Sequence, residues 1–249
     1  MVICEVCVEG VMSALTAEAG GADRIELCAG LVDGGITPSL GTIQGVLDRV
    51  SIPTVVLVRP RRGDFLYSVE EKDVLIRDIR IARESGAYGI ATGALTRDGS
   101  VDRPLMRRVR DEAGPSSLTF HRAFDMVADP MQSLEVLIEL GVDRVLTSGL
   151  ERNVPQGMEM IRELAGQAGG RISVMPGGGI TADNVGSVVS TTGATEIHFT
   201  ATTESKSAMA HKNTRPRMGG DRVLGEFELS LTDQEKVRRI REAAAAPEN

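Results

Sequence analysis

Two short segments near the N-terminus share one pattern, a glutamate followed two positions later by a cysteine. Glu5 and Cys7 form the first pair, and Glu26 and Cys28 form the second. Residues two apart in a β-strand point to the same side, so each extended segment presents a carboxylate and a thiol together. A thiolate is a soft metal ligand, and a carboxylate can transfer protons as a general acid or base. The repeated pair therefore indicates a metal site, an acid–base site, or both.

The cysteines allow a narrower prediction. Cys4 and Cys7 have the spacing of many thiolate sites, but positions three apart in a strand point to opposite faces, so these two should not chelate one ion. Cys7 and Cys28 have matching local contexts on what would be neighbouring strands, and we predict that they hold a soft ion such as Cu(I). The alternative is that both are small buried apolar side chains. A hard divalent ion is a further alternative, with ligands among Glu5, Glu26, Asp125 and His198.

Charged and polar residues also stand where other predicted strands end. Arg59 marks one such position, His-Arg-Ala-Phe-Asp places His121, Arg122 and Asp125 at another, and His198 lies within the last strand. Charged groups are almost never fully buried unless they are paired. The predicted catalytic or ligand-binding set is Glu5, Glu26, Arg59, His121, Arg122, Asp125 and His198. The alternative is a buried ion network that plugs the centre of the fold, formed by Glu5, Glu26, Arg59 and Arg122.

The chemistry that suits this set is proton transfer. The lysines all lie outside the predicted strands, which disfavours a Schiff-base mechanism. The reaction would be an isomerisation, epimerisation or elimination on a sugar-like or phosphorylated small molecule. The roles would be base for Glu26 or Glu5, acid for His121 or His198, and stabilisation of negative charge for Arg59 or Arg122.

A run of three glycines, Gly177 to Gly179, follows another predicted strand and leads into a helix. Free backbone N–H groups and the helix dipole make such a turn an anion site. The predicted anion-binding set is Ser148, Gly149, Gly177, Gly178 and Gly179. The alternative is that the glycines only form a tight turn.

Eight short segments, most of them rich in aliphatic and β-branched residues, can position these side chains as strands. They are residues 2–8, 24–28, 54–60, 87–93, 117–123, 144–149, 171–176 and 196–202. Segments with helical spacing of apolar residues lie between them. Eight strand–helix units in a chain of 249 residues are typical of a (β/α)8 TIM barrel, in which catalytic residues lie at the C-terminal strand ends. A doubly wound open sheet is the alternative. The absence of an early Gly-x-Gly-x-x-Gly favours the barrel.

A repeated glycine supports this organisation. Gly21, Gly86, Gly141 and Gly193 stand shortly before the second, fourth, sixth and eighth strands, where each can end a helix. We therefore expect one domain over residues 1–249. Residues 203–229 show no periodicity and are expected to form a long loop, either a lid or a mobile segment. A final helix is expected over residues 233–243, capped by Ser230 or Thr232, before a frayed tail at 244–249.

The composition excludes several classes of protein. The net charge is −7 and aromatic residues make up 3% of the chain, which disfavours a nucleic-acid surface. Three cysteines in 249 residues disfavour a disulfide scaffold. No apolar run reaches the roughly 20 residues that a membrane span needs, and the N-terminus does not read as a secretory signal. We expect a cytoplasmic protein without nucleic-acid or membrane partners.

Taken in order, these motifs resemble the CutC family, which is named for copper homeostasis. The matching segments include EVCV, RIELC, TFHRAFD, LTSG, PGGGI, EIHFTA and, near the end, MAHKNTRPRMGG. The resemblance covers nearly the whole chain; one departure is Thr200, where the family is expected to have serine. It implies a TIM barrel, a cytosolic homodimer and copper as partner, with Cys7 and Cys28 as Cu(I) ligands. A small polar ligand in the pocket of ionisable residues remains the alternative.

Overall fold

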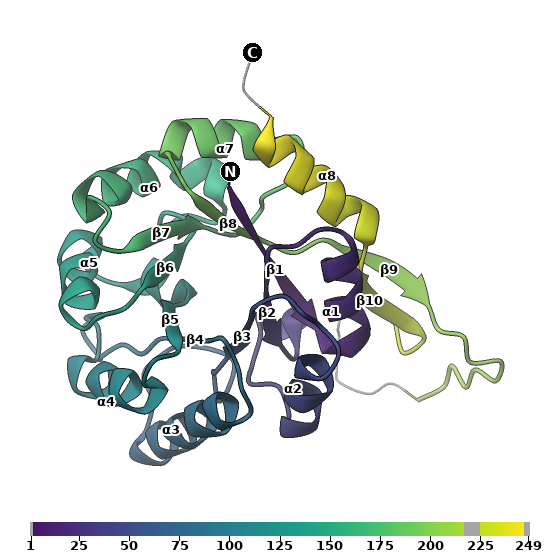
Figure 1. Cartoon of the computed structure of the whole chain (residues 1–249). Coiled ribbons are helices and arrows are strands. Elements are labelled where there is room, and N and C mark those ends of the chain that lie inside the picture. The colour runs from purple at the N-terminus through teal and green to yellow at the C-terminus, as the bar shows by residue number, and fades with distance from the viewer. Residues whose placement is uncertain (1, 217–224, 247–249) are drawn as a thin grey trace.

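The computed structural model describes residues 2–216 and 225–246. Eight parallel strands form a ring in the order β7-β6-β5-β4-β3-β2-β1-β8, with the helices outside it (Figure 1). The strands are β1 Ile3–Glu9, β2 Arg24–Cys28, β3 Thr54–Leu57, β4 Gly89–Thr92, β5 Ser117–Phe120, β6 Arg144–Thr147, β7 Ser173–Pro176 and β8 Glu196–Phe199. A parallel bridge between Gly177 and His198 completes the ring. The predicted (β/α)8 barrel is confirmed.

The helices alternate with the strands as predicted. They are α1 Gly10–Ala19, α2 Leu40–Leu47, α3 Val69–Glu84, α4 Arg103–Ala113, α5 Pro130–Glu139, α6 Val154–Ala168, α7 Val185–Thr192 and α8 Gln234–Ala245, with short 3-10 turns at Leu31–Asp33 and Arg122–Met126. Several begin at a side-chain cap, and Ser68 forms a capping box with Glu71 at the start of α3. The glycines Gly21, Gly86, Gly141 and Gly193 all have positive φ, in keeping with the predicted helix stops.

The two halves of the barrel repeat one side-chain contact. Asp23, just before β2, accepts a hydrogen bond from the N–H of Cys4 on β1 at 2.9 Å. Asp143, just before β6, accepts one from the N–H of Leu118 on β5 at 2.8 Å. Each aspartate ties its strand to the preceding one, so β2 and β6 enter the barrel in the same way. An arginine follows each aspartate, Arg24 on β2 and Arg144 on β6, and both arginines are buried.

The core has two parts that follow from strand alternation. Outward-facing side chains such as Cys4 and Val6 join the large aliphatic core between strands and helices. Inward-facing Cys7 and Cys28 lie instead in a small cluster inside the barrel, with Leu57 and other apolar residues. Cys4 and Cys7 therefore face opposite sides of β1, as their spacing predicts.

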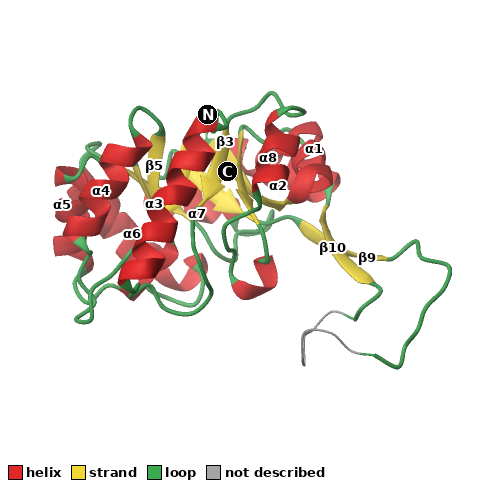
Figure 2. Cartoon of the chain, turned by 90° about the horizontal axis from the view of Figure 1, so that it is seen from below, coloured by secondary structure: helices red, strands yellow, loops and turns green. Residues whose placement is uncertain are grey.

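The segment after β8 differs in part from the expected long loop. Strands β9 Thr202–Lys206 and β10 Glu228–Thr232 pair as an antiparallel ribbon that projects from the barrel (Figure 2). Helix α8 is capped by the side chain of Asp233 rather than by the expected Ser230 or Thr232, and it extends to residue 245, into the expected tail. Parts of the expected loop (217–224), of the last matching motif and of the tail (247–249) lie outside the described residues.

No helix in the described ranges is long and apolar enough to cross a membrane.

Candidate functional site

The N-terminal half of the barrel interior is filled by an ion network. Arg24 contacts the carboxylates of Glu5 and Glu196, and Arg144 contacts Glu196 at 2.6 Å. All four residues are buried, so the charges are compensated by pairing rather than by water. Burial alone would raise the pKa of Glu5, but the hydrogen bond with His198 and the charge of Arg24 lower it to about 2. This network supports the site above it.

A second layer of inward-facing side chains lies two residues farther along β2 and β8, at Glu26 and His198. His198 contacts Glu5 through Nδ1 at 2.8 Å and lies 3.7 Å from Glu26 through Nε2. Burial lowers the pKa of His198, but the charges of Glu26 and Glu5 outweigh it and raise that pKa above its ordinary value. Burial raises the pKa of Glu26. The Cys7 thiol donates to Glu26 Oε2 at 3.4 Å, while Glu26 Oε1 has no partner among the described residues.

The two inward-facing cysteines meet at the top of this layer. Their sulfur atoms, Cys7 Sγ and Cys28 Sγ, lie 3.6 Å apart, and the Cys28 thiol is 3.5 Å from the carbonyl oxygen of Val8. The hydrogen bond with Cys28, burial and the charge of Glu26 raise the pKa of the Cys7 thiol well above its ordinary value. A protonated, buried thiol is a poor nucleophile, and a metal ion could bind Cys7 only by displacing its proton.

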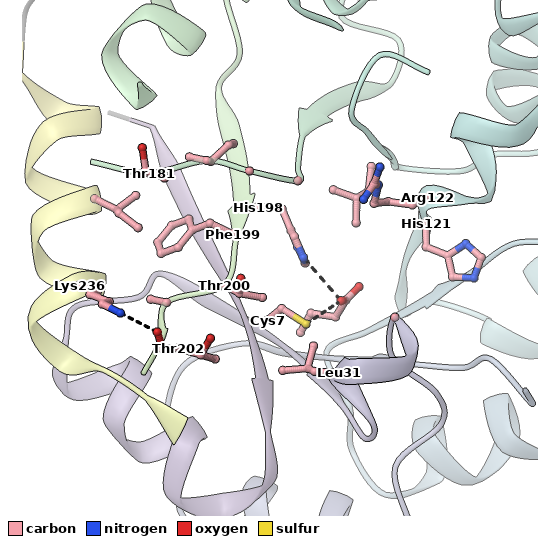
Figure 3. Close-up of a pocket in the computed structure, with 18 of the residues that line it drawn as sticks. Cys7, Leu31, His121, Arg122, Thr181, His198, Phe199, Thr200, Thr202 and Lys236 are labelled. Atoms are coloured by element: carbon pink, nitrogen blue, oxygen red, sulfur yellow. Dashed lines mark hydrogen bonds and ion pairs between the residues drawn. The ribbon is translucent and has the colours of Figure 1, made fainter. Parts of the chain in front are cut away.

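The same residues form a donor set suited to a metal ion. Ligand atoms of Cys7, Glu26 and His198 lie within 4.8 Å of one another, and all three side chains are buried. Figure 3 shows Cys7 and His198 meeting at the carboxylate between them. With the nearby sulfur of Cys28, the cluster offers thiolate, imidazole and carboxylate ligands, of which the thiolates are soft.

His121 presents a hydrogen-bond donor without an acceptor. Its Nδ1 accepts from the N–H of Ala123 at 3.2 Å, so in the neutral ring the proton is on Nε2. That nitrogen is buried and has no partner in the described part of the chain. Burial and the charge of Arg59 lower the pKa of His121 to about 3. The ring is therefore a neutral donor over the ordinary pH range.

Arg59 is occupied by the backbone around it. Its guanidinium donates to the carbonyl oxygens of Gly34, Gly35 and Gly63 at 2.8–3.2 Å and lies over the ring of Phe65 at 5.0 Å. Arg59 therefore joins two loops at the barrel rim, and most of its donors are used in doing so.

Arg122 and Asp125 form a rigid group with Ser148. Asp125 accepts from Arg122 Nε at 2.7 Å and from the backbone and hydroxyl of Ser148. Arg122 Nη2 donates to the Ser148 hydroxyl at 2.7 Å. The structure thus gives Asp125 and Ser148 the task of holding Arg122, and neither of them lines the cavity.

A cavity of about 840 Å³ opens above the cluster at the C-terminal end of the barrel. Its walls include Cys7, Glu26, Arg59, His121, Arg122 and His198. Of the predicted anion-binding residues, Gly178 and Gly179 line it. Gly177 instead donates to the carbonyl oxygen of Thr147 at 2.9 Å, and Gly149 packs against the backbone of Gly157. Glu5 and Cys28 do not line the cavity: Glu5 lies beneath it, and Cys28 contacts the cavity-lining Cys7 through its sulfur.

Several residues of the site escape the sequence analysis. Arg24 and Arg144 each begin a strand and follow a repeated Gly-x-Asp motif. They stand two positions before Glu26 and Leu146, so strand alternation predicts that both arginines face the barrel interior. Lys236 and Arg239 of α8 also line the cavity. Nothing in the sequence connects that helix with the barrel mouth.

Comparison with known sequences identifies close relatives. A sequence model of the CutC family matches residues 2–203. The human protein named copper homeostasis protein cutC homolog is 49% identical over 238 residues, which cover 96% of this chain and 87% of the human chain. The mouse protein of the same name is also 49% identical, over 96% of this chain and 88% of its own.

Solved structures agree on the fold. A crystal structure of the protein named CutC from Streptococcus agalactiae has a TM-score of 0.76 and 30% identity, covering 80% of this chain and 98% of that one. The phosphoribosylanthranilate isomerase of Pyrococcus furiosus has a TM-score of 0.54 at 15% identity, with 98% of each chain covered. The second similarity concerns the barrel fold alone.

Proposed function

The chain belongs to the CutC family, and we propose that it serves copper homeostasis by binding Cu(I) at Cys7 and Cys28. One observation carries the proposal: two buried thiols from neighbouring strands have their sulfurs 3.6 Å apart. Soft thiolate ligands select Cu(I). Copper is the cargo in this proposal, and the setting is the reducing cytoplasm, where such thiols stay free.

The spacing of the sulfurs favours a bent site. If each metal–sulfur bond measures about 2.3 Å, the zinc–thiolate length, sulfurs 3.6 Å apart subtend an angle of about 103° at the ion. A linear arrangement would need the sulfurs about 4.6 Å apart with the same bond length. A bent site has room for a third ligand, and ligand atoms of Glu26 and His198 lie within 4.8 Å of each other and of the Cys7 sulfur. We therefore expect His198 or Glu26 to supply a third ligand.

Titration of the reduced protein with Cu(I) under anaerobic conditions, against a competing chelator, tests this site. We expect Cys7→Ser and Cys28→Ser to abolish tight binding of one equivalent. Cys4→Ser is the matched control, because Cys4 is equally buried but faces the outer core. Circular dichroism and thermal unfolding establish that each variant is folded. Unchanged stoichiometry and affinity in the Cys7→Ser/Cys28→Ser double variant would remove this pair as the site.

A second candidate function is acid–base catalysis on a small polar molecule. The observation that favours it is the cavity of about 840 Å³, far larger than an ion. His121 and Glu26 line it, and His121 Nε2 and Glu26 Oε1 have no partner among the described residues. Glu26 would remove a proton from carbon, and the neutral His121 ring would donate a hydrogen bond to the developing oxyanion. Glu5 is held by Arg24 and His198 beneath the cavity, which leaves Glu26 as the base.

Exchange of carbon-bound protons in deuterated water, followed by NMR over a panel of sugars and sugar phosphates, tests the catalytic candidate. We expect wild-type protein to label a substrate, and Glu26→Gln to lose the labelling. His121→Asn should slow it by about 10²-fold or more. Glu196→Gln is not a control, because it disturbs the ion network; Glu139→Gln, at an exposed surface pair, serves instead. Equal labelling by Glu26→Gln and wild-type protein would refute the assignment.

A further inference from the structure

We infer that the cavity contains an oxyanion subsite, formed by Arg122 and the turn between β7 and α7, for a small hydroxylated organic anion. This subsite rests on the second candidate function, because both place a small molecule in the same cavity. The expected ligand has a phosphate or carboxylate at one end and a hydroxyl group at the other.

Arg122 is held so that one nitrogen remains available. Its Nε donates to Asp125 and its Nη2 to Ser148, both at 2.7 Å. Its Nη1 has no hydrogen-bond partner among the described residues and lies beside Gly178, 3.2 Å from where a Cβ atom of that residue would be. A guanidinium fixed in this way keeps Nη1 available for an oxyanion at little entropic cost.

The neighbouring turn adds backbone donors. The N–H groups of Gly179 and Ile180 donate no hydrogen bond to the described part of the chain. Gly179 has a φ of 78°, and a Cβ atom there would come within 2.9 Å of the Asn153 side chain, so only glycine fits. Consecutive free N–H groups ahead of a helix form an anion-binding concavity.

The buried end of the cavity supplies the independent evidence for a ligand. His121 and Glu26 are 5% and 4% exposed, yet His121 Nε2 and Glu26 Oε1 lack partners in the part of the chain that the structure describes. A buried polar atom without a partner is costly. His121 Nε2 is a donor, and Glu26 Oε1 is an acceptor oxygen of a carboxyl group. A hydroxyl group can accept from the first and donate to the second, which a carboxylate without a hydroxyl group cannot do.

The charges at the cavity mouth agree with an anionic ligand. Arg122, Lys236 and Arg239 line it together with one exposed carboxylate, that of Asp183. Lys236 contacts the carbonyl oxygen of Thr202 at 2.7 Å and comes from α8, across the cavity from Arg122 and His121 (Figure 3). The mouth thus has a positive balance on a protein whose net charge is −7.

Binding of four probes to the copper-free, reduced protein tests the subsite by calorimetry. The probes are glycerol 3-phosphate, glycerate, glycerol and inorganic phosphate. We expect saturable binding of glycerol 3-phosphate or glycerate with a Kd below about 1 mM, and none of glycerol. Tighter binding of glycerol 3-phosphate would identify a phosphate as the group that the subsite prefers, and tighter binding of glycerate would identify a carboxylate.

Variants then assign the two ends. Arg122→Gln should weaken the organic anion and inorganic phosphate alike, by about tenfold or more. His121→Asn should weaken only the hydroxylated anion. Asp183→Asn should strengthen both. Arg97→Gln, an exposed arginine outside the cavity wall, is the control for net charge and should change nothing.

The outcomes separate this inference from the proposed functions. Failure of both organic anions to bind, or equal affinities in Arg122→Gln and Arg97→Gln, overturns the subsite. Anion binding without proton exchange supports the subsite and counts against catalysis. Exchange that is indifferent to Arg122→Gln overturns the subsite while leaving catalysis standing. Loss of Cu(I) binding in the cysteine variants is independent of all these results.

Discussion

Replacing Arg24 by methionine should destabilise the protein far more than loss of a surface arginine. Arg24 is 4% exposed and pairs with Glu5 and Glu196 inside the barrel. Methionine keeps much of the volume but leaves Glu5, among the described residues, with His198 alone as an ion-pair partner. Removing one partner from a buried ion pair typically costs about 3–5 kcal/mol, because the other charge remains buried.

The pKa of Glu5 gives an independent measure of how much its pairing stabilises the fold. Folding lowers it from 4.5 to about 2, which at about 1.4 kcal/mol per pH unit amounts to about 3 kcal/mol. Because the folded-state pKa is depressed, this stability is present above pH 4.5 and is lost as the pH falls towards 2. Arg24 supplies part of that lowering, so the deficit of Arg24→Met should shrink below pH 4.5.

Urea unfolding followed by circular dichroism, at neutral pH and at about pH 4, measures both effects. Arg108→Met is the control, because Arg108 pairs with Asp73 at the exposed surface and should cost about 0–1 kcal/mol. Adding Glu5→Gln to Arg24→Met should restore part of the lost stability by removing the buried carboxylate that has lost its arginine. A cost for Arg24→Met no larger than the control, or no recovery in the double variant, would refute the reasoning.

Two further predictions concern groups outside that network. The pKa values of the two buried histidines should be shifted in opposite directions. NMR titration of the ring carbons should give a pKa of about 3 for His121 and a pKa above the ordinary value for His198. A higher pKa for His121 than for His198 would contradict these environments. Gly157→Ala should destabilise by about 1–3 kcal/mol in thermal unfolding, since its Cβ atom would lie 2.0 Å from the carbonyl oxygen of Ser148. Gly166→Ala in the same helix meets nothing within 4 Å and should stabilise by about 0.5–1 kcal/mol; similar effects of the two changes would show that the close approach does not constrain the helix.

Local patterns in the sequence predict the barrel and the cysteine pair well. Strand periodicity and repeated glycines fix the number of units, and alternation along a strand separates Cys4 from Cys7. The same alternation brings Cys7 and Cys28 to one side because β1 and β2 are adjacent and parallel. These inferences need only short-range geometry and a regular connection between strands.

Other features depend on contacts that no local pattern contains. The partners of Arg24 include Glu196, 172 residues away. Strand alternation indicates that Arg24 faces inward, but it does not identify a partner so distant in the sequence. Asp125 and Ser148 stand at strand exits as predicted, but the loops turn them towards Arg122 rather than into the cavity. The contribution of α8 depends on where a helix packs after a long excursion of the chain, which tertiary contacts alone decide.

The cysteine, glutamate and histidine cluster joins residues from the first and the last strand of the barrel. Cys7, Glu26 and Cys28 are all made within the first 28 residues, whereas His198 follows 170 residues later and pairs with β1 across the closing edge of the ring. During synthesis the thiol pair therefore exists long before its imidazole neighbour, and the site becomes complete only when the last strand docks. An ion held by Cys7 and His198 would join the first and last strands, so its occupancy should slow the opening of the barrel at that edge.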